Sequence, residues 1–125
     1  MTDNVNHPAH YAPKFGSKTI ECIDITRHMS FLLGNAFKYV WRAGYKGGKD
    51  KAIEDLKKAN FYLQDCYNNH AETVSVISSQ LFKLLKKEGS DRFAALSCIV
   101  NGDCVSAMSL VSHMIDALER GEEIG

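Results

Sequence analysis

The chain has 125 residues, of which 45% are hydrophobic and 24% are charged, and its formal net charge is zero. This composition is typical of a globular protein and excludes an extensively disordered chain, and the length fits one domain, residues 1–125. The zero net charge argues against a protein that coats duplex nucleic acid through a broad positive field.

The first twenty residues contain both prolines of the chain, Pro8 and Pro13, and we expect residues 1–20 to form an extended arm. They lack the charged and apolar regions of a secretory signal, and no apolar run approaches the roughly 18 to 20 residues that span a bilayer. The four cysteines form no CxxC pair, and with the histidines they match no usual zinc spacing. We therefore expect a cytoplasmic protein with reduced thiols, no metal site and no membrane partner.

Apolar residues recur with helical spacing from residue 21 onwards. A short helix is predicted over 21–29, and a clearer one follows and ends at Gly44, a residue type suited to a helix C-terminus. The third helix is predicted to begin with Asp50 as its N-cap and to run to about Asn68. The apolar faces of the second and third helices predict an antiparallel hairpin; they comprise Leu33, Ala36, Phe37, Val40, Trp41, Ala52, Leu56, Ala59, Leu63 and Cys66.

Three further helices are predicted in residues 70–125. The first carries apolar residues from Val74 to Leu85 and ends at Gly89, and the other two begin at the caps Ser90 and Asp103. No segment alternates with the period of a strand. The sequence thus predicts an all-α domain of five to six helices with an extended arm and a central hairpin. Residues 70–125 are a candidate homo-oligomer interface, because they are rich in apolar residues, including Met108 and Met114.

Polar residues with helical spacing form a second row on each helix of the predicted hairpin. If the hairpin packs through its apolar faces, the two rows converge along one edge. Arginine and lysine there would suit phosphate, and Tyr39 or Tyr62 would suit stacking on a base. We call this set the basic stripe, and it comprises Asn35, Lys38, Tyr39, Arg42, Lys46 and Lys58.

The alternative interpretation of the basic stripe is a solvated helix face with ion pairs such as Glu54 to Lys58. Asp55 is the acid within the stripe, and orienting Lys58 or Arg42 is the role we expect for it, in preference to holding a metal ion. The loop from Gly44 to Asp50 does not fit the phosphate-loop pattern GxxxxGK[ST], since Asp50 occupies the hydroxyl position and no strand precedes it.

Five sequence blocks lie in order over residues 5–63: VNHPAHY at 5–11, IECID at 20–24, LGNAFKY at 33–39, RAGYKGG at 42–48, and EDLKKA at 54–59 with Tyr62 and Leu63. This order resembles a small phage and prophage family that is catalogued as of unknown function and labelled nucleotide kinase-like. The resemblance implies nucleoside monophosphate kinase activity on deoxynucleotides in the host cytoplasm. It makes candidate site residues of His7, His10, Tyr11, Glu21, Asp24, Asn35, Lys38, Tyr39, Arg42, Lys46, Asp55 and Lys58.

Three functions are compatible with these residues. The first is a phosphoryl transferase with a nucleoside triphosphate donor, with or without magnesium, in which Arg42, Lys38 and His10 are the candidate catalytic residues. The second is a protein that sequesters a nucleotide without turnover and so counters bacterial nucleotide signalling in defence. The third is a scaffold or an inhibitor of a host protein, for which the basic stripe is only surface.

Overall fold

The computed structural model describes residues 20–85 and 89–125. Within these ranges the chain forms six helices and no strand, so the all-α fold class is confirmed. The arm predicted over residues 1–20 lies outside the described residues except for Ile20. The helices are α1 (Cys22–Thr26), α2 (Phe31–Arg42), α3 (Lys49–Asn68), α4 (Val76–Phe82), α5 (Asp91–Val100) and α6 (Cys104–Glu119).

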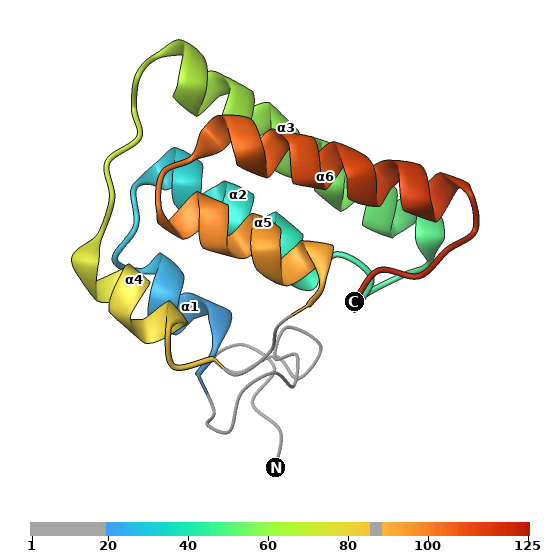
Figure 1. Cartoon of the computed structure of the whole chain (residues 1–125), viewed down its shortest axis with the longest axis horizontal. Coiled ribbons are helices and arrows are strands. Elements are labelled where there is room, and N and C mark those ends of the chain that lie inside the picture. Colours follow the sequence, from blue (N-terminus) through green and yellow to red (C-terminus); the bar gives the residue numbers. More distant parts are fainter. Residues whose placement is uncertain (1–19, 86–88) are drawn as a thin grey trace.

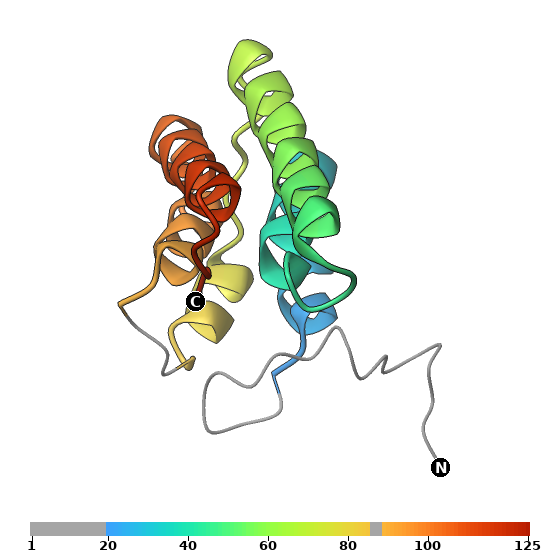
Figure 2. The ribbon, with the colours of Figure 1, turned by 90° about the vertical axis from the view of Figure 1, so that its right-hand side faces the viewer.

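The helices are arranged in two stacks, which Figure 2 shows side by side: α1, α2 and α3 form one stack, and α4, α5 and α6 form the other. Across the junction α1 contacts α4, α2 contacts α5, and α3 contacts α6, so that α3 and α6 run along each other in Figure 1. Each stack repeats the order short, medium and long, although the sequence shows no recognisable repeat. The second half of the chain therefore covers the apolar side of the first half.

The predicted hairpin of α2 and α3 is present, and the apolar residues predicted for its two faces are all buried. Trp41 and Phe37 are the largest side chains in this core, with ring centroids 5.6 Å apart. Met114 of α6 is fully buried and Met108 is partly buried. Both methionines therefore contribute to the internal core, and the homo-oligomer interface over residues 70–125 stays a prediction.

The helix ends follow local capping chemistry, with differences from the prediction at three helices. Asp50 is not the N-cap of α3: Gly48 is, because its backbone is extended and its carbonyl accepts the first helical hydrogen bond, from Ala52 at 3.0 Å. The helix predicted from Val74 begins later, at Val76, because the Ser75 hydroxyl accepts from the Ser78 amide. That helix, α4, ends at Phe82 and not at Gly89 as predicted. The helix predicted over 21–29 is shorter in the structure, where α1 covers only Cys22–Thr26.

The predicted caps of α5 and α6 are confirmed. The Ser90 hydroxyl accepts from the Phe93 amide, and the Asp103 carboxylate accepts from the Ser106 amide, each at 3.1 Å. Among the helices described, none combines the length and apolar character that a bilayer crossing requires.

Replacing Asp103 with alanine is expected to lower the free energy of unfolding by about 1 kcal/mol, because the amides at the start of α6 lose their acceptor. Urea denaturation followed by circular dichroism measures this change. Asp116→Ala, an exposed acid in the body of α6, is the matched control and should change the free energy of unfolding by less than about 0.5 kcal/mol. Equal losses in the two variants would contradict the capping role.

Candidate functional site

The two polar rows of the hairpin meet at a pair of tyrosines. Tyr39 of α2 stacks on Tyr62 of α3, with ring centroids 6.0 Å apart and ring planes inclined by 9°. The antiparallel packing of the two apolar faces brings the rows together, as the spacing predicted. The tyrosines therefore stack on each other across the hairpin.

Three cationic side chains of the basic stripe surround the Tyr39 ring. The Lys38 ammonium lies 4.5 Å from the ring centroid, the Arg42 guanidinium carbon 4.8 Å, and the Lys58 ammonium 5.5 Å. The electron-rich ring attracts each cation, which helps to hold three like charges in one place. Such a cluster is suited to an oxyanion, since arginine supplies a planar fork and lysine a point charge.

Asp55 lies beneath this cluster and is fully buried. Its Oδ1 atom lies 3.2 Å from Nη2 of Arg42 and 3.4 Å from Nζ of Lys51. Within the described residues, its Oδ2 atom has no hydrogen-bond partner. A buried carboxylate needs cationic partners, and Asp55 in return fixes the position of Arg42. Arg42 is one of the two cations, with Lys58, that the sequence analysis expected Asp55 to orient.

The exposed Glu54 contributes a weaker set of ion pairs, 2.9 Å from Lys51 and 3.8 Å from Lys58. The hydrogen bond and charge of Lys51 lower the pKa of Glu54, and Glu54 in turn raises the pKa of Lys51. Lys38 has no ion pair within residues 20–85 and 89–125. Of the three cations at Tyr39, Lys38 is therefore the one without a described counter-charge.

Cys22 of α1 lies close enough to Lys38 and Arg42 for their charges to act on its thiol. Burial raises the pKa of its thiol to about 12, and the nearby charges of Lys38 and Arg42 oppose this shift without reversing it. The thiol is therefore neutral near pH 7. The sequence pattern placed Cys22 on the apolar side of its helix and gave no sign of its closeness to the two cations.

The remaining predicted site residues are dispersed. The Asn35 side chain donates to the Phe31 carbonyl at 2.8 Å, and Lys46 is exposed in the loop between α2 and α3. Glu21 and Asp24 form the capping box of α1. His7, His10 and Tyr11 lie outside the described residues. Among the residues that are described, no three His, Cys, Asp or Glu side chains are grouped as metal ligands.

Two exposed phenylalanines adjoin the tyrosine pair, and the sequence reasoning missed them. Phe31 and Phe61 each pack edge-on against Tyr62, with ring centroids at 6.0 and 5.5 Å. Phe31 lies two residues before Leu33, where the apolar pattern of α2 begins, and Phe61 lies off the apolar face of α3. That mismatch with the periodicity is the signal that could have identified them.

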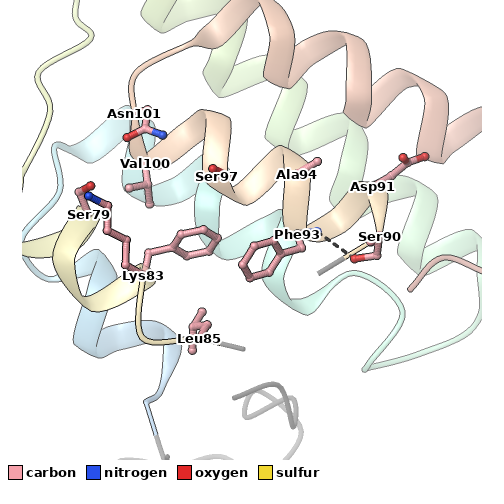
Figure 3. A pocket seen from close by; sticks show the side chains of 12 residues that line it. Ser79, Lys83, Leu85, Ser90, Asp91, Phe93, Ala94, Ser97, Val100 and Asn101 are labelled. Carbon is pink, nitrogen blue, oxygen red and sulfur yellow. Dashed lines mark hydrogen bonds between the residues drawn. The ribbon is translucent and has the colours of Figure 1, made fainter. Parts of the chain in front are cut away.

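A separate hollow of about 650 Å³ lies between α4 and α5 (Figure 3). Its floor includes Phe82 and Phe93, whose rings stack at 4.7 Å, and its single lysine or arginine is Lys83. None of the residues of the basic stripe lines it. The chemistry of this hollow is mainly apolar, so it does not extend the cationic site.

Residues 5–64 match the sequence profile of a family described as proteins of unknown function, DUF3310. The chain is also similar to the Gene 1.7 protein of Enterobacteria phage T3, with 35% identity over 74 residues, which cover 56% of this chain and 45% of the phage protein. The aligned part thus spans less than half the length of that relative. No solved structure matches the chain. These similarities support a bacteriophage origin, and they relate residues 5–64 to the DUF3310 family, whose function is unknown.

Proposed function

We propose that the chain binds a nucleotide through its phosphate and acts as a phosphoryl transferase of the nucleoside monophosphate kinase type. The observation that carries this proposal is the grouping of Lys38, Arg42 and Lys58 around one tyrosine ring, at 4.5 to 5.5 Å. Phosphoryl transfer depends mainly on positioning and on positive charge at the transferring oxygens. An acceptor phosphate is already ionised near neutral pH, so this reaction needs no strong base.

The position of Asp55 supports the same function. Its contact with Arg42 holds the guanidinium at the site, so less side-chain freedom is lost when an anion binds. Lys38, with no described carboxylate beside it, would be the cation that responds most directly to an incoming phosphate. A donor nucleoside triphosphate and any magnesium ion on it would enter as substrate.

Sequestration of a nucleotide without turnover is the second candidate function. It is supported by the same cations around Tyr39, because they would hold the phosphate of a nucleotide whether or not a reaction follows. The two functions use the same surface. They differ in whether the nucleotide is chemically changed.

The test is to incubate the purified protein with mixed deoxynucleoside monophosphates and a triphosphate, with and without magnesium, and to separate the products by chromatography. We expect new diphosphates, with a rate at least about tenfold lower in Lys38→Ala and in Arg42→Ala, which corresponds to about 1.4 kcal/mol of transition-state stabilisation. Arg42→Ala removes a partner of the buried Asp55 and could destabilise the fold. Lys38 has no described ion pair with Asp55, so a loss of activity in Lys38→Ala is not explained by misfolding.

Lys83→Ala, an exposed lysine beside the hollow between α4 and α5, is the matched control and should retain full activity. Tight binding with the nucleotide recovered unchanged would reject the kinase and support sequestration. Absence of binding would reject both and leave a scaffold or a host-protein inhibitor.

A further inference from the structure

Two exposed aromatic side chains adjoin the tyrosine pair. Phe31, the first residue of α2, is 73% exposed, and Phe61 of α3 is 66% exposed. Both rings pack against Tyr62, so the four aromatic rings form one continuous cluster on the surface of the hairpin. Large apolar side chains that gather at the surface beside polar groups are typical of a binding surface.

Each exposed phenylalanine shares a shallow hollow with a lysine of the cationic cluster. A hollow of about 270 Å³ is lined by Phe31 and Lys38, together with Asn35. Another of about 490 Å³ is lined by Phe61 and Lys58, together with Lys57 and the acids Asp50 and Glu54. The surface therefore offers an aromatic ring beside a cation at two places, and the Arg42 guanidinium also lies over the Tyr39 ring.

This repetition corresponds to the chemistry of a single nucleic-acid strand, in which flat bases alternate with anionic phosphates. Bases stack on aromatic side chains regardless of sequence, while the phosphates track a positively charged surface. We infer that the α2–α3 surface binds single-stranded nucleic acid, with bases stacked on Phe31 and Phe61 and phosphates held by Lys38, Arg42 and Lys58. This inference rests on the same cations as the proposed function but requires a ligand longer than one nucleotide.

Two other occupants fit the surface less well. A duplex keeps its bases stacked inside the helix and offers few free base faces to Phe31 or Phe61. A second copy of the chain, docked symmetrically through the same patch, would bring a second set of lysines and arginine against the first. Such like-charge juxtaposition is unfavourable. The positive charge next to the rings favours a polyanion.

The test is fluorescence anisotropy with dye-labelled oligothymidylates of increasing length, compared with labelled thymidine monophosphate and a labelled duplex. We expect affinity to rise from the mononucleotide to the short oligonucleotide and to fall as salt is added. Phe31→Ala and Phe61→Ala should each weaken oligonucleotide binding by about fivefold or more. Both side chains are exposed, so these variants should fold, and circular dichroism checks this. Tyr67→Ala, which removes another exposed aromatic ring from α3, is the matched control and should bind as the unmodified chain does.

Three outcomes would overturn the inference: an oligonucleotide that binds no more tightly than the mononucleotide, phenylalanine variants that bind like the unmodified chain, or a phenylalanine variant whose oligomeric state changes in light scattering. The last would assign the surface to a second copy. The proposed function fails separately, if no mononucleotide is converted while oligonucleotide binding still depends on Phe31, Phe61 and Lys38. In the opposite case, the protein converts mononucleotides but does not bind oligonucleotides. If that conversion depends on Arg42 and is unchanged in the phenylalanine variants, the proposed function stands and the inference fails.

Discussion

Replacing Asp55 with alanine is expected to lower the free energy of unfolding by about 3 kcal/mol, which is the scale for removing one partner from a buried ion pair. The Asp55 side chain has no exposed surface, and its Oδ1 atom contacts both Arg42 and Lys51. In the Asp55→Ala variant, Arg42 would remain largely buried next to Lys38 and Lys58. It would also lose the carboxylate of Asp55, the nearest described negative charge. Urea denaturation followed by circular dichroism measures the loss.

The chain provides a matched control for this prediction in the neighbouring acid. Glu54 contacts two of the same group of cations, Lys51 and Lys58, but its side chain is exposed. Water screens such pairs, and Glu54→Ala should cost less than about 0.5 kcal/mol. Asp55→Asn keeps the shape of the side chain and removes only its charge, so it should fall between the two. A Glu54→Ala loss as large as that of Asp55→Ala would contradict the explanation by burial.

Helix periodicity predicted most of the fold because the apolar faces are regular. The face of α2 from Leu33 to Trp41 and that of α3 from Ala52 to Cys66 are buried where the spacing placed them. Once two such faces pack in antiparallel directions, the convergence of the polar rows at Tyr39 and Tyr62 follows from geometry alone. This is why the meeting of the rows could be predicted, while the ligand that they bind could not.

Local spacing failed where burial depends on contacts between distant segments. Asp55 follows the polar row of α3, yet it is buried, and Arg42 of α2 and Lys51 on the preceding turn of α3 contact it. Phe31 and Phe61 are apolar, yet both are exposed because no other described helix covers that side of the hairpin. Helix capping failed at Asp50 for a simpler reason: Gly48 adopts the extended backbone first, so the helix has already begun.

Arg92 is the largest omission of the sequence reasoning, because nothing in its neighbourhood along the chain marks it as a buried residue. Only 2% of it is exposed, and its Nη1 atom donates to the carbonyls of Val40 at 2.7 Å and Trp41 at 3.1 Å. These carbonyls belong to the last turn of α2, where helical partners run out. A cation there also interacts favourably with the helix dipole, so α5 supplies the C-terminal cap of α2 across more than fifty residues.

Replacing Arg92 with alanine is therefore expected to lower the free energy of unfolding by about 3 kcal/mol, since it removes charge-assisted hydrogen bonds and leaves buried carbonyls without a donor. Burial lowers the pKa of Arg92, but an arginine stays charged throughout the pH range in which the protein would be studied. Arg92→Lys retains the charge without the planar fork and should recover part of the loss. Arg120→Ala is the matched control, because that side chain is exposed and its ion pair is with the exposed Glu122, so its loss should be below about 0.5 kcal/mol. If Arg92→Ala unfolds at the same urea concentration as Arg120→Ala, the carbonyls of Val40 and Trp41 do not depend on this cap.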